Sequence, residues 1–191
     1  DGEPVATELR RAWVAKLAAR DQWQAVADWF DPEASDASLS CQHARALGAL
    51  NGQEAERSAI ELWLTPQRLP PECEPVFDWL RGRNVLADAL VEQRVRALLT
   101  NGQASFARTI ARQLPTERAA PLLQWADLLE RPEQSIDRMF ADPAELRGIE
   151  RAALFAGWNK LARHDPEAAR ERFGRLATLI ARKNVGEYAL A

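Results

Sequence analysis

Residues 38–80, SLSCQHARALGALNGQEAERSAIELWLTPQRLPPECEPVFDWL, decide the fold of this 191-residue chain. The stretch opens with a helical pattern that stops at Asn51 and Gly52, because glycine just past a helix end accepts the left-handed backbone conformation there. A second helix ends at Leu64, and prolines then interrupt the connector, since proline lacks the backbone donor that a helix needs. A third helix follows over residues 72–82. The stretch therefore predicts a helical hairpin joined to a further helix.

The same helix–turn–helix pattern recurs on both sides of this stretch. WVAKLAARDQWQAV, RALLTNGQASFARTI and WNKLARHDPEAARERF each combine an apolar stripe, a two-residue break and an early alanine in the next helix. The breaks begin at Arg20, Asn51, Asn101 and His164, so their spacing is less regular than in a tetratricopeptide array. We predict an all-α fold of about 10–12 helices, arranged as stacked antiparallel hairpins in a tetratricopeptide-like, right-handed superhelix. Residues 1–191 are expected to form one such domain, truncated at one or both ends.

Local signals predict where several of these helices begin and which side they bury. The first helix, residues 4–20, carries an apolar stripe at every fourth position, namely Val5, Leu9, Trp13 and Leu17. Asp21 is the expected cap of the second helix, and Ser38 or Ser40 is expected to start the third.

Prolines supply similar signals further along the chain. Pro132 and Pro143 are each expected to be the first residue of a helix, and the second of these helices is expected to reach Arg163. Asp142 is the predicted cap before Pro143, with Glu145 as the reciprocating residue of a capping box. A last helix is predicted to begin at Glu187.

Composition narrows the function classes. The formal net charge is −3 and the pI about 5.6, which does not favour nucleic-acid binding, because that function usually leaves a basic footprint. No apolar run approaches the roughly 18 residues of a membrane-spanning helix, and the opening DGEPVATELR is not a signal peptide. The two cysteines, Cys41 and Cys73, allow either two buried thiols or one disulfide, depending on the redox compartment.

The sequence offers no recognisable catalytic or metal-binding set. Its two histidines, His43 and His164, fall in different predicted hairpins and are interpreted as structural residues. A glycine-rich phosphate loop and a clustered cysteine–histidine motif are both missing, and no carboxylate pair stands out as an acid–base dyad. We therefore predict no catalytic residue, no metal ligand and no cofactor, and the sequence does not identify substrate-binding residues.

Tryptophans and one basic helix face remain as candidate binding elements. The seven tryptophans are Trp13, Trp23, Trp29, Trp63, Trp79, Trp125 and Trp158. They are interpreted mainly as fillers between hairpins, with the alternative that one or two stack on sugar rings. The basic residues of the last long helix are Arg170, Arg172, Arg175, Arg182 and Lys183. This face is expected to be solvated, with attraction of an anionic polymer or a partner domain as the alternative.

Three segments resemble a known family. LRRAWVAKLAARDQW, ELWLTPQRLPPECEPVFDWL and VEQRVRALLTNGQASFARTIARQLP are similar to the soluble lytic murein transglycosylases, in their non-catalytic, superhelical U-shaped domain. LARHDPEAARERF fits the later part of that domain, so the resemblance covers about residues 9–180. The most specific portion is 62–80, where a tryptophan-containing helix end, a proline-rich connector, a cysteine and an FDW-type helix follow one another.

The resemblance implies a function that residue patterns alone do not give. Members of this family are periplasmic enzymes that cleave peptidoglycan glycan strands between N-acetylmuramic acid and N-acetylglucosamine, forming 1,6-anhydromuramyl products. Their catalytic glutamate belongs to a Glu-Ser motif in a lysozyme-like domain, and this chain contains no Glu-Ser dipeptide. The chain is thus expected to be a structural and substrate-guiding domain that is inactive alone.

Further expectations follow from the same resemblance. The expected partners are the lysozyme-like catalytic domain of the same parent chain and peptidoglycan glycan strands, and the expected location is the periplasm. In that compartment Cys41 and Cys73 are expected to form a disulfide. The main alternative is a tetratricopeptide-like scaffold that binds a protein partner and has no role in glycan cleavage. An all-α enzyme acting alone is disfavoured by the missing site.

Overall fold

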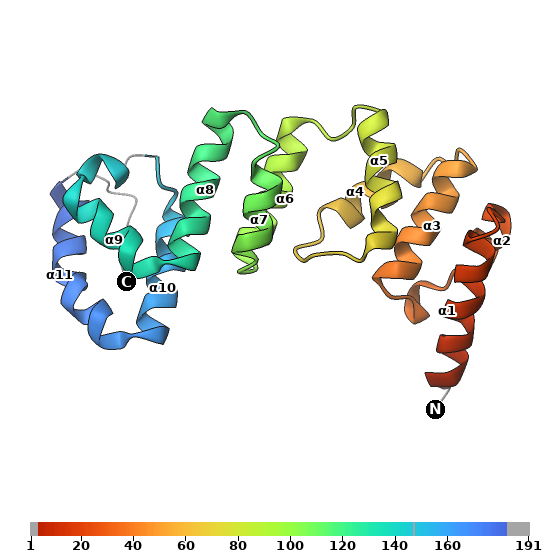
Figure 1. Cartoon of the computed structure of the whole chain (residues 1–191), viewed down its shortest axis with the longest axis horizontal. Helices are drawn as coiled ribbons and strands as arrows, with labels where there is room; N and C mark the ends of the chain where they lie inside the picture. Colours follow the sequence, from red (N-terminus) through yellow and green to blue (C-terminus); the bar gives the residue numbers. More distant parts are fainter. Residues whose placement is uncertain (1–3, 147, 183–191) are drawn as a thin grey trace. The chain divides into compact units, whose positions relative to one another are not determined.

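The computed structural model describes residues 4–146 and 148–182, and these residues form eleven α-helices and no β-strand (Figure 1). The predicted all-α class and the predicted number of helices are confirmed. The helix predicted from Glu187 lies outside the described residues. None of the described helices combines the length and the apolar character that crossing a membrane requires. The chain divides into two compact units, residues 1–89 and 90–191, and its assignment to a single domain stays a prediction.

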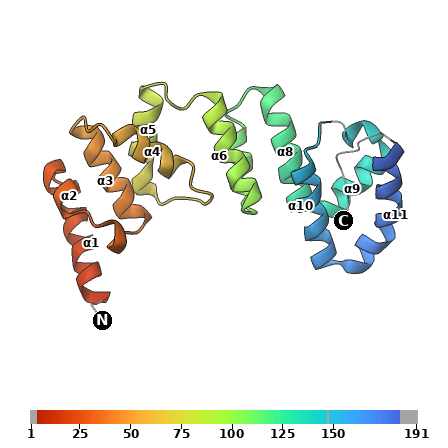
Figure 2. The same ribbon diagram turned by 180° about the vertical axis from the view of Figure 1, so that it is seen from behind.

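The first unit is organised around its third helix. Its elements are α1 (Pro4–Ala18), α2 (Trp23–Trp29), the short 3₁₀ helix η1 (Pro32–Ala34), α3 (Ala37–Ala49), α4 (Ala55–Trp63), the 3₁₀ helix η2 (Pro71–Cys73) and α5 (Glu74–Gly82). Helix α3 contacts α1 and α2 on one side and α4, η2 and α5 on the other (Figures 1 and 2). The α1–α2 hairpin and the α4–α5 segment therefore both pack on α3.

Aromatic packing joins the last two helices of this unit. Trp63 at the end of α4 and Phe77 on α5 are both buried, and their rings meet edge to face with centroids 5.1 Å apart. This geometry places the positive ring edge against the negative ring face, which adds to the effect of burial alone. The proline-rich connector thus joins two helices that pack on each other.

The apolar stripe predicted on α1 is largely not the buried side. Val5, Leu9 and Trp13 are exposed, whereas Val14 and Leu17 pack into the core with Ala18. A spacing of four residues drifts around a helix of 3.6 residues per turn, so only the last member of the predicted stripe reaches the core.

The helix starts in this unit differ from the predicted caps. Asp36, not Ser38 or Ser40, caps α3, and its Oδ1 accepts a hydrogen bond of 2.9 Å from the backbone N–H of Leu39. Asp21 does not cap α2 because it occupies the left-handed turn conformation, with φ at 53°, between α1 and α2. At the Asn51–Gly52 stop the left-handed residue is likewise Asn51, with φ at 54°. Asparagine and aspartate tolerate this conformation better than most residues do.

The second unit begins within α6. Its elements are α6 (Asp88–Thr100), α7 (Ala104–Ala111), α8 (Thr116–Glu130), α9 (Pro132–Ala141), the 3₁₀ helix η3 (Pro143–Leu146), α10 (Arg151–His164) and α11 (Pro166–Arg182). Helix α8 contacts α7, α9 and α10, and α11 packs on α9 and α10. Pro121 lies inside α8, in its second turn.

The helix predicted from Pro143 to Arg163 is in fact two elements. Residues 143–146 form only η3, and α10 starts at Arg151. Gly148 lies between them with φ at 85°, a conformation that a right-handed helix cannot contain. Asp142 does cap the first element, as predicted, by accepting a 2.8 Å bond from the Ala144 N–H. Glu145 does not complete a capping box, because its backbone carbonyl and its carboxylate face Gln124 instead.

Close approach of α8 and α10 depends on Gly157. A Cβ atom at this position would lie 2.9 Å from the Leu128 Cβ and 3.1 Å from the Leu128 carbonyl oxygen. Such distances are shorter than van der Waals contact, so only glycine permits this packing.

The basic side of α11 faces its neighbour more than we predicted. The side chain of Arg172 is 17% exposed and pairs with Glu133 (2.7 Å) and Asp137 (2.9 Å) of α9. The guanidinium of Arg175 lies 4.5 Å from the ring centroid of Phe140, also on α9. These two arginines are therefore part of the packing between α9 and α11, while Arg170 is exposed as expected.

Candidate functional site

A groove in the first unit lies between α2, α3 and α5 and encloses about 440 Å³. The residues that shape it are Asp21, Trp23, Arg45, Gly48, Pro75 and Trp79. Asp21 precedes α2 and Trp23 begins it, Arg45 and Gly48 lie in the second half of α3, and Pro75 and Trp79 lie at the start and centre of α5. Two half-buried indoles and a pair of opposite charges thus border one hollow.

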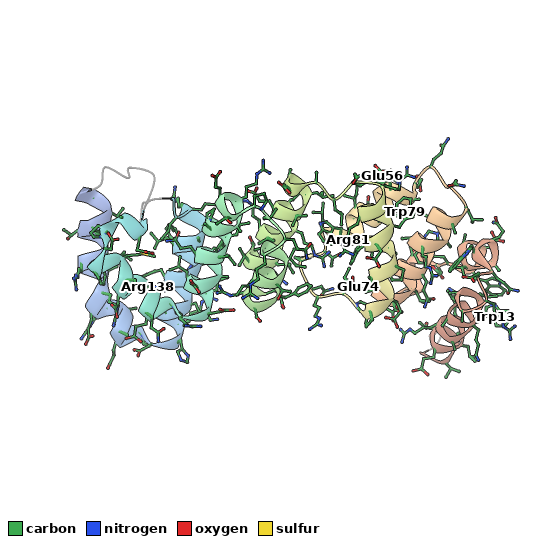
Figure 3. The ribbon with its side chains drawn as sticks, turned by 45° about the horizontal axis from the view of Figure 1, so that its top comes forward. Trp13, Glu56, Glu74, Trp79, Arg81 and Arg138 are labelled. Atoms are coloured by element: carbon green, nitrogen blue, oxygen red, sulfur yellow. A yellow bond between two sulfur atoms is a disulfide. The ribbon has the colours of Figure 1, made fainter. Side chains whose placement is uncertain are left out.

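Gly48 makes room for the indole of Trp79. A Cβ atom on Gly48 would lie 3.4 Å from Cε2 and 3.5 Å from Nε1 of Trp79, so the ring packs directly against the α3 backbone. The guanidinium of Arg83 lies 5.0 Å from the centroid of the same ring without lining the groove. Trp79, labelled in Figure 3, is thereby held in place while part of its surface faces the groove.

Charged and aromatic groups together form the opposite border. The guanidinium of Arg45 lies 4.5 Å from the Trp23 ring centroid, a favourable cation–π distance. It is also 4.0 Å from the carboxylate of Asp21, and both charged side chains are solvent-exposed. A carboxylate accepts hydrogen bonds only and a guanidinium donates only, so this border offers both functions to a bound molecule.

A disulfide between Cys41 and Cys73 links two sides of the groove. Cys41 lies on α3 and Cys73 ends η2, which leads directly into α5, and both residues are fully buried. The bond therefore ties the helix that carries Gly48 to the segment that carries Pro75 and Trp79. Because these residues come from different helices, such a link keeps the two walls together.

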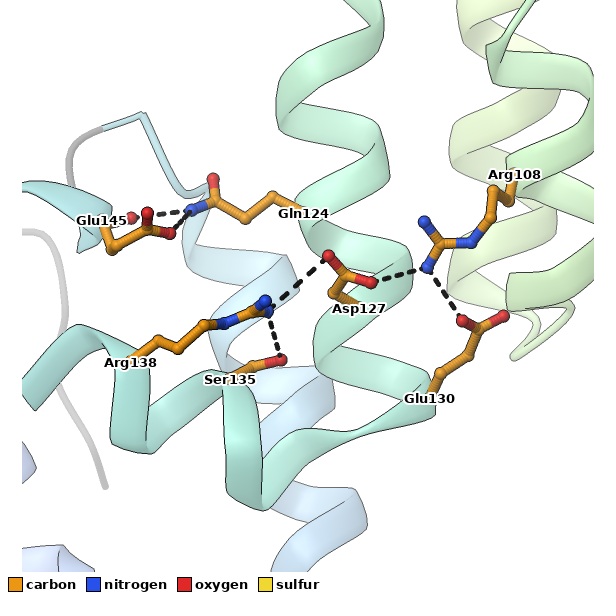
Figure 4. A network of polar contacts seen from close by, with 7 residues as sticks. All are labelled: Arg108, Gln124, Asp127, Glu130, Ser135, Arg138 and Glu145. Atoms are coloured by element: carbon orange, nitrogen blue, oxygen red, sulfur yellow. Dashed lines mark hydrogen bonds and ion pairs between the residues drawn. The ribbon is translucent and has the colours of Figure 1, made fainter.

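The second unit presents a polar network instead, built from α7, α8 and α9 (Figure 4). Arg108 donates bonds of 2.8 Å to both Asp127 and Glu130, and Arg138 lies 3.6 Å from Asp127. Asp127 and Glu130 therefore each have a cationic partner. Such pairing is typical of a structural network, and it does not favour a carboxyl group acting as a general acid.

A further hollow of about 550 Å³ in the second unit is bordered by Lys160, Arg163 and His164, together with Thr100 and Asn159. The three basic side chains are exposed and follow one another at the end of α10. Cations at a helix C-terminus complement the partial negative charge there, which explains their position structurally.

The histidines and tryptophans were interpreted mainly as structural residues, and several of them are packed inside the fold while others are exposed. His43 stacks on Phe30 with ring centroids 3.8 Å apart, and burial lowers its pKa below the ordinary value, partly offset by Glu54. Trp63 and Trp125 are buried, whereas Trp13 and Trp29 are exposed. Within the residues the structure describes, no three histidine, cysteine or acidic side chains gather as metal ligands would.

Two bacterial proteins illustrate what this chain is similar to in sequence. The chain is 23% identical over 168 residues to the soluble lytic murein transglycosylase of Escherichia coli, and 23% identical over the same length to that of Salmonella typhimurium. Each match covers 87% of this chain. The chain is homologous to part of the soluble lytic murein transglycosylases. It spans about a quarter of these relatives, 26% of their length.

Solved structures share the fold. The lytic transglycosylase Slt of Pseudomonas aeruginosa matches 96% of this chain with a TM-score of 0.71 and 23% identity. The 70 kDa soluble lytic transglycosylase of Escherichia coli matches 91% with a TM-score of 0.68 and 21% identity. The chain covers 28% of each of these structures. No family model matches the sequence.

The family resemblance implied the Cys41–Cys73 disulfide that the structure contains, but nothing in the sequence analysis indicated the groove beside it. The seven tryptophans carried no mark that distinguished Trp23 and Trp79 from the rest. One usable signal was Gly48, a glycine inside the otherwise alanine-rich α3, which indicates that a bulky group approaches the helix there.

Proposed function

We propose that this chain is a non-catalytic region of a peptidoglycan lytic transglycosylase, and that it holds and guides the glycan strand for a catalytic domain elsewhere in the parent protein. The observation that carries the proposal is the homology, which extends over most of the chain and is matched by the fold. Peptidoglycan is the material on which the named relatives act, so the parent protein is assigned the same material.

The proposal assigns binding of the glycan strand to this chain and its cleavage to another domain of the parent protein. Its sequence has no Glu-Ser dipeptide, the motif that holds the catalytic glutamate in the family it resembles. The parent enzyme would cleave the bond between N-acetylmuramic acid and N-acetylglucosamine with a glutamate from its lysozyme-like domain. The present region would keep the strand near that glutamate, since a tethered binding surface raises the effective substrate concentration. The proposed location is the periplasm, where peptidoglycan lies and where a Cys41–Cys73 disulfide is stable.

Co-sedimentation with insoluble peptidoglycan tests this role directly. We expect the purified chain to sediment with intact sacculi, and to release no 1,6-anhydromuropeptides that chromatography and mass spectrometry detect. Sacculi stripped of their stem peptides should bind as well as intact ones, because the glycan is the proposed ligand.

Two results would contradict the proposal in different ways. Absence of binding to both preparations would remove the guiding role and favour the tetratricopeptide-like protein scaffold. Release of anhydromuropeptides by the chain alone would show that it is catalytic.

A further inference from the structure

We infer that the groove between α2, α3 and α5 is a binding site for one N-acetylhexosamine unit of a glycan strand, with Trp79 as its stacking platform. The inference rests on the proposed function and assigns part of it to named residues.

The first argument is the preorganised indole. Trp79 packs on the α3 backbone at Gly48 and also lines the groove, so its ring is already ordered before a ligand arrives. A pyranose ring has one face of C–H groups, and such a face packs on the electron-rich face of an aromatic ring. Because the indole is already fixed, little side-chain freedom is lost on binding.

The second argument is the charge of the groove. Asp21 and Arg45 place one negative and one positive group at the same border, 4.0 Å apart. They offer an acceptor and several donors but almost no net charge. A neutral sugar with hydroxyl and acetamide groups uses both kinds of partner. A strongly anionic or cationic peptide would meet a like charge and gain little.

The third argument is size and rigidity. The volume of about 440 Å³ lies within the usual range of small-ligand sites, about 300–1,000 Å³. The Cys41–Cys73 bond holds α3 against the segment that leads into α5, so the walls do not need to assemble around the ligand. Pro75 adds a further rigid apolar surface beside Trp79.

The test uses the whole chain labelled with nitrogen-15 and the tetramer of N-acetylglucosamine as the probe. The chain has seven tryptophans, and each gives one indole N–H resonance that single Trp→Phe variants assign. We expect the tetramer to shift the resonances of Trp23 and Trp79. The resonances of Trp13 and Trp29, exposed on α1 and α2 outside the groove, should not move.

Substitutions measure the contribution of the groove. Trp79→Ala should weaken binding roughly tenfold or more, because it removes the platform. Trp29→Ala is the matched control, since it removes an exposed tryptophan of the same unit that does not line the groove. Trp79→Ala also removes packing on Gly48, so Arg45→Gln is the second variant. Arg45 is exposed, and its replacement should weaken binding without unfolding the chain.

The outcomes separate this inference from the proposed function. Binding with the expected shifts, weakened by Arg45→Gln and not by Trp29→Ala, supports the site. Binding of sacculi with unchanged Trp23 and Trp79 resonances overturns the site and leaves the guiding role intact. Failure to bind either the tetramer or sacculi overturns both. A peptide that moves these resonances when the tetramer does not would also overturn the site, in favour of a protein scaffold.

Discussion

The two units of the chain are held together by different means. The first contains both cysteines, joined as a disulfide, and an edge-to-face pair of buried aromatic rings. Its ion pairs lie at the surface, as Arg57 shows with a side chain 70% exposed. In the second unit Arg108 and Arg172 are only partly exposed, and each of them joins two carboxylates of a neighbouring helix.

This difference predicts how each unit responds to its surroundings. A disulfide stabilises mainly by restricting the unfolded chain, so salt and mild acid affect its contribution little. Ion pairs weaken when salt screens them or when acid protonates the carboxylates. The first unit should therefore respond chiefly to reductant, with a smaller response to mild acid through His43, and the second chiefly to salt and to pH below about 4. The groove belongs to the unit whose walls are linked covalently.

Loss of the disulfide should give the largest effect. We expect the Cys41→Ser/Cys73→Ser double variant to lose roughly 3–4 kcal/mol of stability in the first unit, the value for closing a loop of this length. The two cysteines are separated by 32 residues. Hydrogen exchange of the full chain, followed by mass spectrometry, should show faster exchange in residues 4–89 and unchanged exchange in residues 90–182.

Two controls support the disulfide measurement. Wild-type chain treated with reductant should reproduce the exchange pattern of the double variant, and thiol titration should find no free cysteine before treatment. Equal loss of protection in both units would show that they do not respond separately, contrary to the comparison above.

Gly157→Ala should give the next largest effect, in the second unit. The new Cβ would lie 2.9 Å from the Leu128 Cβ, and overpacking of this kind costs about 1–3 kcal/mol. Alanine regains up to about 1 kcal/mol of helix propensity, so a net destabilisation is expected. Gly174→Ala on α11 is the matched control, because nothing lies within 4 Å of its new Cβ. Thermal denaturation should show a lower Tm for the first variant and a slightly higher Tm for the second.

Removal of an ion-pair centre should have a smaller effect. Arg108→Gln breaks contacts to Asp127 and Glu130 and should cost about 1 kcal/mol at low salt. Arg57→Gln in the first unit removes pairs with Glu54 and Glu61 that are far more exposed, and it should change stability by less than about 0.5 kcal/mol. Urea denaturation at about 0.05 M and about 1 M salt measures both, and the cost of Arg108→Gln should shrink at high salt. If both variants lost the same free energy of unfolding, the lower exposure of Arg108 would not strengthen its ion pairs, contrary to the comparison of the two units.

Local signals in the sequence predicted where the helices lie better than they predicted which residues those helices bury. Apolar periodicity and prolines placed the hairpins, because helix formation depends on near neighbours. The exposed stripe of Val5, Leu9 and Trp13 was predicted as buried, since periodicity does not say which helices pack on α1. The break near Gly148 was missed for a related reason, as a lone glycine is tolerated in many helices.

The candidate site was predictable only in part. The pairing of Cys41 and Cys73 came from a family resemblance that implied an oxidising compartment, not from their positions in the sequence. The groove requires Trp79 to lie against Gly48 and Arg45 to lie over Trp23. These contacts join different helices, and their geometry is set by how α3 packs on α2 and α5. A sequence without aligned relatives does not reveal such packing.

Acid should affect the two units at different pH values, with the smallest expected change. Burial lowers the pKa of His43 in the first unit, so the unfolded chain binds a proton more readily than the folded one. Stability of this unit is therefore complete above the ordinary histidine value of about 6.5 and declines as the pH falls below it. In the second unit the hydrogen bond from Arg172 lowers the pKa of Asp137, so the corresponding decline begins only below about pH 4.

Hydrogen exchange measured at several pH values, with intrinsic exchange rates corrected, separates these two declines. Between pH 7 and 5 the first unit should lose protection while the second does not, and His43→Gln should flatten that dependence. Asp137→Asn should leave this range unchanged and reduce the loss that the second unit shows below pH 4. If both units loosened together near pH 6, the histidine stacked on Phe30 would not be the group that controls the first decline. The different responses of the two units would then have to come from the disulfide and the ion pairs alone.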